Sequence, residues 1–128
     1  GVRFFLDAYN ANPSSMRLSL ESYIDYCETN KISTGHYLVI LGDMNELGEA
    51  AAATHQEIGE ILKKRGVDNV AFIGRYSAEY QSGFQGKGLE FKSVEDFATH
   101  FKKVRTEFEN IFIKGSRSLQ LESILDIT

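Results

Sequence analysis

The chain has 128 residues, a length typical of one domain and sufficient to bury a hydrophobic core. Hydrophobic residues make up 42% of it and charged residues 25%, which excludes a disordered tail, a collagen-like repeat and a disulfide scaffold. The net charge is −4 and no basic cluster is present, so neither nucleic acid nor a membrane surface is an expected partner. No apolar run approaches the roughly 20 residues of a membrane-spanning helix. The single cysteine, Cys27, indicates a reducing compartment.

Segments with strand and helix periodicity alternate along the whole chain. An apolar run over 2–8 is typical of a strand covered on both faces, and a helix over about 15–29 follows, capped by Ser14 or Ser15. The next predicted elements are a strand at 37–41, a helix at about 50–65 ending at Gly66, a strand at 70–73, a helix at about 76–82, a strand at 89–92, a helix at 94–108, a strand at 110–114 and a helix at 117–126.

This alternation requires right-handed crossovers. We therefore predict one open-sheet α/β domain over residues 1–128, with a mostly parallel sheet and helices on both faces. The chain starts almost directly on an apolar strand and stops just after an apolar helix, with no initiator methionine and no secretory leader. That pattern favours a module of a longer protein over a processed or tagged small protein.

Polar residues follow several of the predicted strands. In open α/β sheets ligands bind beyond the carboxyl ends of the strands, where helix N-termini also point. We therefore expect a ligand site formed by the segments 7–12, 42–48, 74–75 and 114–118.

The first of these segments is the most unusual. Asp7 closes a buried strand and could accept two ribose hydroxyls or order neighbouring backbone N–H groups, while Asn10 and Asn12 offer donors and acceptors to a ligand. The same residues are equally typical of an Asx turn with a helix cap, stiffened by Pro13. Spacing alone leaves both interpretations open.

The second segment places Asp43 and Glu46 between two glycines, where they could hold an ammonium group or a hydrated cation, or only neutralise the N-terminus of the following helix. His55 falls on the apolar face of that helix, where a hydrogen-bonded core histidine is the more common case. Three scattered histidines and one cysteine form no convincing zinc site.

The last segment ends a strand and opens a helix. Lys114 and Arg117, together with free helix N–H groups, make a seat for a carboxylate or phosphate; the alternative is a capped helix with a solvated arginine. The glycine-rich segment 83–88 lacks the spacing of a phosphate loop and follows a helix, so we read it as a flexible bend. The chain therefore has no triphosphate-binding loop of its own.

Taken together, DAYNANP at 7–13, LGDMNELG at 41–48 with His55 and Gly59, and KGSRS at 114–118 resemble the C-terminal domain of the Mur ligases. Within that family the resemblance is to ligases that add D-Ala-D-Ala to UDP-N-acetylmuramoyl-tripeptide, and it covers essentially the whole chain. It implies a Rossmann-like third domain that closes over a site shared with the N-terminal and central domains of the same chain. The central domain would supply the phosphate loop and the ligands of Mg²⁺, and the reaction would use ATP and an acyl phosphate.

The resemblance also implies roles for individual residues. Asp7 would contact the ribose of ATP, and Tyr9, Asn10 and Asn12 would line the nucleotide and amine side. The dipeptide would be seated by residues of the later segments, with Asn12 beside them: Asp43, Glu46, Leu47, His55, Lys114, Ser116 and Arg117. Asp43, Glu46 and His55 could instead be structural even in the family. The resemblance further implies that the whole protein is a monomer in the bacterial cytoplasm and that the fragment is inactive in isolation.

A receiver-type phosphoacceptor domain is the alternative from another class, because Asp7, Asp43 and Lys114 end strands as its acidic and lysine residues do. Ala8 and Gly115 depart from that pattern, since receivers pair two acidic residues after the first strand and follow the lysine with proline. A dinucleotide-binding domain is a weaker alternative, because no G-x-G-x-x-G follows the first strand.

Overall fold

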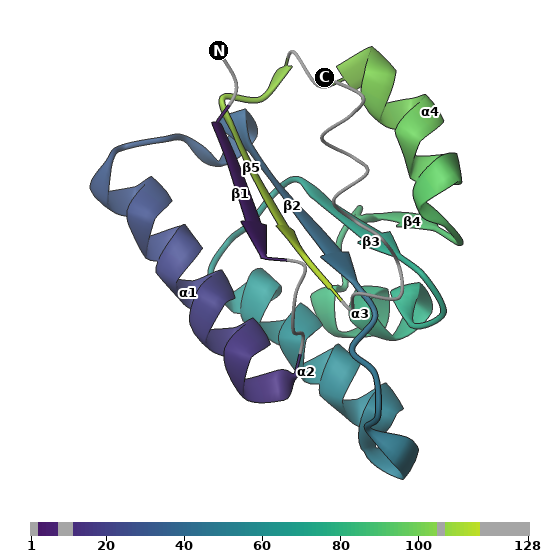
Figure 1. The fold of residues 1–128 in the computed structure, drawn as a ribbon. Helices are drawn as coiled ribbons and strands as arrows, with labels where there is room; N and C mark the ends of the chain where they lie inside the picture. The colour runs from purple at the N-terminus through teal and green to yellow at the C-terminus, as the bar shows by residue number, and fades with distance from the viewer. Residues whose placement is uncertain (1–2, 8–11, 105–106, 116–128) are drawn as a thin grey trace.

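The computed structural model describes residues 3–7, 12–104 and 107–115, except for the side chains of Asp7 and Val104. It contains a five-stranded sheet in the order β1-β5-β2-β3-β4, with every neighbouring pair parallel (Figure 1). The strands are β1 (Arg3–Asp7), β2 (Tyr37–Gly42), β3 (Val70–Ile73), β4 (Leu89–Phe91) and β5 (Asn110–Lys114). The helices are α1 (Pro13–Thr29), α2 (Ala51–Lys64), α3 (Ser77–Phe84) and α4 (Val94–Val104), with short 3₁₀ turns η1 (Thr34–His36) and η2 (Gly48–Ala50).

The sheet has a hydrophobic core on each face. Helices α1, α2 and α3 cover one face, and α4 covers the other (Figure 1). The side chains of β2 alternate between the two cores: Val39 and Leu41 join the first, and Leu38 and Ile40 join the second. Strands β2, β3 and β5 are buried at every position, and each has an apolar run in the sequence, flanked in β5 by the buried Asn110 and Lys114. The predicted α/β architecture is confirmed.

Strand β1 is less covered than expected. It lies at the edge of the described sheet, beside β5 alone. Phe5 packs against the α1 side and Phe4 against the α4 side, but Leu6 is 38% exposed. The expectation of a strand covered on both faces therefore holds only in part for β1, because Phe4 and Phe5 each pack against one core whereas Leu6 stays exposed.

Two helix boundaries differ from the sequence predictions. Helix α1 begins at Pro13, and its cap is Asn12 rather than Ser14 or Ser15: the Asn12 Oδ1 accepts the Ser15 N–H at 2.9 Å. Proline suits the first helical position, because its missing N–H has no partner there anyway. Helix α4 is described as far as Val104, and Phe108, predicted inside it, is buried but not helical. The predicted helix at 117–126 lies outside the described residues.

Helices α2 and α3 touch through their backbones. A Cβ on Gly59 would lie 2.1 Å from the carbonyl oxygen of Tyr80, and one on Gly83 would lie 1.9 Å from that of Gln56. Only glycine permits so close an approach at these two positions, since a real Cβ would overlap a carbonyl group that cannot move alone. The pair therefore fixes how α3 sits against α2.

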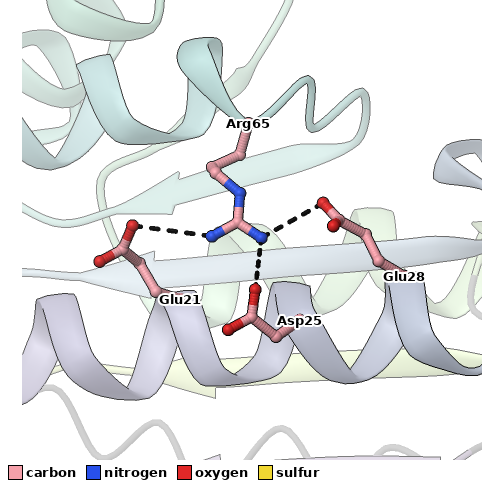
Figure 2. Close-up of polar contacts among 4 residues, drawn as sticks. All are labelled: Glu21, Asp25, Glu28 and Arg65. Atoms are coloured by element: carbon pink, nitrogen blue, oxygen red, sulfur yellow. Dashed lines mark hydrogen bonds and ion pairs between the residues drawn. The ribbon is translucent and has the colours of Figure 1, made fainter.

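Arg65 forms ion pairs that join helices α1 and α2 at the surface (Figure 2). The guanidinium of Arg65, at the C-cap of α2, lies 2.6 Å from Asp25, 3.2 Å from Glu28 and 3.6 Å from Glu21, all on α1. The three carboxylates are three or four residues apart and so lie on one face of α1. Within the described ranges, no helix combines the length and apolar character required to cross a bilayer.

Candidate functional site

The loops that follow β2 and β3 enclose a cavity at the carboxyl edge of the sheet. Parallel pairing of β2 with β3, with Gly42 opposite Ile73, brings the two loops together although they are about 30 residues apart in the chain. The cavity has a volume of about 370 Å³. Its lining residues come from both loops: Asp43, Met44, Asn45, Glu46, Leu47, Gly48, Arg75 and Tyr76. This is one of the strand-end positions where the sequence predicts a ligand site.

Asp43 joins the two loops. It is 8% exposed, and its two carboxylate oxygens accept the backbone N–H groups of Arg75 at 2.9 Å and Tyr76 at 2.8 Å. Such bonds to an ionised acceptor are stronger than neutral ones. Gly74 makes the approach possible: its φ is 117°, and a Cβ there would lie 2.6 Å from the Asp43 Oδ2. Asp43 therefore orders the β3–α3 loop, rather than the start of α2 that follows it in the chain.

His55, on α2, holds the β2–α2 loop through a hydrogen bond to its backbone. It is fully buried on α2, its Nε2 accepts the Met44 N–H at 2.9 Å, and its Nδ1–H donates to the Ala51 carbonyl at 2.6 Å. These two partners assign the neutral tautomer with the proton on Nδ1. Burial lowers the pKa of His55 below its ordinary value, which keeps the ring neutral. Of the two roles that the sequence allows for His55, core residue and ligand-binding residue, these contacts match the hydrogen-bonded core residue.

Two tyrosines, Tyr76 in the cavity lining and the buried Tyr80, pack near His55. The Tyr76 ring stacks on His55 with centroids 4.2 Å apart, and the fully buried Tyr80 hydroxyl donates to the Gly42 carbonyl at 2.6 Å. Burial raises the pKa of Tyr80 well above its ordinary value, so the hydroxyl remains a donor. Neither tyrosine was among the predicted site residues. Their four-residue spacing, which puts both on one helix face, is the signal that could have found them.

Glu46 and Leu47 also line the cavity. Glu46 is exposed and has φ 63°, in the left-handed region that disfavours most side chains, so the loop turns sharply at this residue. Leu47 is half-buried and packs against the α1–α3 core. Both lie where the sequence analysis expected substrate-binding residues. The described ranges contain no group of three or more His, Cys, Asp or Glu side chains that could hold a metal ion.

The other predicted site residues are distributed along the same edge. Asp7 and Lys114 are the last residues of β1 and β5 and are direct partners in the parallel register, and Lys114 is fully buried. Asn12, the cap of α1, is exposed and is not among the residues that line the cavity. Four predicted residues lie outside the described ranges: Tyr9, Asn10, Ser116 and Arg117.

Comparisons with known proteins agree with this architecture. The family model described as "Mur ligase, glutamate ligase domain" matches residues 1–117. A curated protein of Rickettsia prowazekii, named UDP-N-acetylmuramoyl-tripeptide--D-alanyl-D-alanine ligase, is 33% identical over 97% of this chain, which covers 27% of that protein. The protein of the same name from Escherichia coli is 31% identical over 93% of the chain, which covers 25% of it. The chain thus spans about a quarter of the length of these relatives.

Solved structures share the fold. A crystal structure of MurF from Acinetobacter baumannii superposes with a TM-score of 0.77 at 22% identity, over 96% of this chain and 27% of that one. MurF from Thermotoga maritima, solved in complex with ADP, superposes with a TM-score of 0.71 at 24% identity, over 97% of this chain and 27% of that one. With a family model matching nearly its whole length, this chain belongs to the Mur ligase family and corresponds to its glutamate ligase domain.

Proposed function

We propose that this chain is the C-terminal domain of an ATP-dependent ligase that adds D-Ala-D-Ala to UDP-N-acetylmuramoyl-tripeptide in peptidoglycan synthesis. The observation that supports it most is the 33% identity over 97% of the chain to a ligase of that name. The chain covers 27% of that relative, which fits one domain beside an N-terminal and a central domain. The reaction belongs to the whole protein, and the isolated chain is inactive in this proposal.

In the proposed reaction, a carboxylate oxygen of the tripeptide attacks the γ-phosphorus of ATP and ADP leaves. The amine of D-Ala-D-Ala then attacks the carbonyl carbon of the acyl phosphate, inorganic phosphate leaves, and the amine nitrogen loses its proton. The described residues do not form a site for Mg²⁺, because no suitable cluster exists among them and Asp43 spends both oxygens on backbone N–H groups. In the proposal, magnesium and the phosphate loop belong to the central domain.

This chain would bind and orient substrates. Asp7 would accept hydrogen bonds from the ribose hydroxyls of ATP. Tyr9, Asn10 and Asn12 would line the side of the site that faces the nucleotide and the amine of the dipeptide. The ADP in the crystal of Thermotoga maritima MurF supports nucleotide binding by a relative of this fold. The cavity between the β2–α2 and β3–α3 loops would receive the dipeptide, with Ser116 and Arg117 completing the seat beyond β5.

The buried cysteine supports a reducing compartment, and we place the ligase in the bacterial cytoplasm, acting as a monomer. The receiver-type alternative requires a carboxylate oxygen of Asp43 that is free to attack a phosphodonor. Both oxygens are hydrogen-bonded and the side chain is 8% exposed, which favours the ligase over the receiver. A small phosphodonor with Mg²⁺ should therefore leave no acid-labile phosphate on Asp43.

The proposal is tested with the full-length protein and the isolated chain side by side. We expect phosphate release by the full-length protein only when ATP, UDP-N-acetylmuramoyl-tripeptide and D-Ala-D-Ala are all present, and none by the isolated chain. Replacing Asp7 with Ala should raise the KM for ATP about 10- to 100-fold, since a hydrogen bond to a charged group contributes about 1.5–3 kcal/mol. Turnover by the isolated chain, or none by the full-length protein, would contradict the proposal.

A further inference from the structure

The charged side chains around the cavity differ in whether they bind other parts of the protein. Asp43 uses both oxygens to hold backbone N–H groups, whereas Glu46 and Arg75 are exposed at the rim. Among the described residues that line the cavity, Arg75 alone carries a positive charge. Among the arginines of the described ranges, Arg65 forms ion pairs with three carboxylates, Arg17 pairs with Glu57 and Arg3 donates to the Tyr26 hydroxyl. Within the part of the chain that the structure describes, the guanidinium of Arg75 lies over the Tyr76 ring and forms no ion pair with a carboxylate.

The position of Arg75 is nevertheless well defined. Its backbone N–H donates to Asp43, so the Cα is held at the mouth of the cavity. Its guanidinium lies 5.6 Å from the centroid of the Tyr76 ring, which is itself stacked on the buried His55. An arginine over an aromatic face keeps its N–H edge available, and that edge matches a carboxylate with two parallel hydrogen bonds. The loop therefore presents a positioned anion-binding group toward the cavity.

The chemistry of the proposed reaction indicates which anion this is. D-Ala-D-Ala carries an ammonium group and a carboxylate, and its nitrogen must be neutral to attack the acyl phosphate. The carboxylate is then the charge that persists through the reaction and can anchor the dipeptide. Glu46, at the opposite loop, repels a carboxylate and can accept an N–H, so the two rim charges favour one orientation of the dipeptide.

We propose that Arg75 binds the C-terminal carboxylate of D-Ala-D-Ala and makes the ligase selective for dipeptides with a free carboxylate. The inference rests on the proposed function and adds to it a specificity-determining residue from the β3–α3 loop. It concerns binding and orientation; the covalent steps are unchanged.

The test compares two substrates, D-Ala-D-Ala and its C-terminal amide, in the full-length ligase. The wild type should use the carboxylate form with a kcat/KM about 10- to 100-fold higher than the amide, the range expected for hydrogen bonds to a charged group. Arg75→Ala should raise the KM for D-Ala-D-Ala by a similar factor, leave the KM for ATP unchanged and remove the preference over the amide. Arg75→Lys, which keeps the charge but loses the paired N–H edge, should retain part of the preference.

Arg3→Ala is the matched control, because Arg3 is an exposed arginine at the amino end of β1, on the opposite edge of the sheet. It should behave as the wild type with both substrates. If the wild type turns over D-Ala-D-Ala and Arg75→Ala keeps the full preference over the amide, the role of Arg75 is refuted while the proposed function stands. A variant that raises the KM for ATP and for D-Ala-D-Ala equally would also refute it. If the wild type does not use D-Ala-D-Ala at all, the proposed function fails and the inference with it.

Discussion

The link between Asp43 and the β3–α3 loop should be a major source of stability. Asp43→Ala removes two hydrogen bonds from backbone N–H groups to a charged acceptor, each of which contributes about 1.5–3 kcal/mol. Water can enter from the adjacent cavity and satisfy part of the lost bonding, so we take the lower end and expect a loss of about 3 kcal/mol. That is a large share of the roughly 5–15 kcal/mol by which native domains are stable.

Urea unfolding of the chain measures this loss. With a slope of about 2 kcal/mol/M, a typical value for a small domain, 3 kcal/mol lowers the midpoint by about 1.5 M. Asp96→Ala, which removes an exposed carboxylate from the first turn of α4, is the matched control and should cost about 0.3–1 kcal/mol. A midpoint for Asp43→Ala within about 0.3 M of the wild type would refute the reasoning.

A double-mutant cycle with Gly74 sharpens the test. Gly74→Ala would place a Cβ 2.6 Å from the Asp43 carboxylate and force Ala into φ 117°, so it should lose the Asp43 bonds in addition to about 1–3 kcal/mol of backbone strain. In the Asp43→Ala background only the strain remains, because the carboxylate is already gone. The two losses should therefore be less than additive. Additivity within about 0.5 kcal/mol would mean that Gly74 does not act through Asp43.

Three further predictions concern the supporting structure. Burial lowers the pKa of His55 below 6.5 in the folded chain, so the unfolded chain binds the proton more tightly and the free energy of unfolding should fall as the pH drops through 6.5. The urea midpoints at pH 5.5 and pH 7.5 should therefore differ less for His55→Gln than for the wild type. His36→Gln, at an exposed site, is the control and should behave as the wild type. Gly83→Ala should lower the thermal midpoint by 10 °C or more, since separating α3 from α2 costs several kcal/mol of packing; an unchanged midpoint would contradict the backbone contact. Arg65→Met should cost about 1 kcal/mol in dilute salt and clearly less in 1 M NaCl, and equal costs would rule out an ionic origin.

The sequence predicts where much of the candidate site lies, but it does not predict which residues contact one another there. The segment with Asp43, Glu46 and Leu47 was expected at a strand end, and it lines the cavity. The hydrogen-bond partners of the Asp43 carboxylate could not be predicted, because the two N–H groups that it binds are 32 and 33 residues away in the chain. The roles proposed for Asp7 and Lys114 remain predictions, although their strands place them side by side in the register.

The sequence alone determined the type and order of the described strands and helices, though not every boundary, since alternating apolar periodicities, strand-end polar residues and Gly66 after α2 are local features of the chain. Tertiary structure decided what those elements meet. The insertion of β5 between β1 and β2, the contact of Gly59 and Gly83 with neighbouring helices and the lining of one cavity by both Glu46 and Arg75 depend on parts of the chain far apart in sequence. No local pattern records such a pairing, because it results from the packing of all the layers at once.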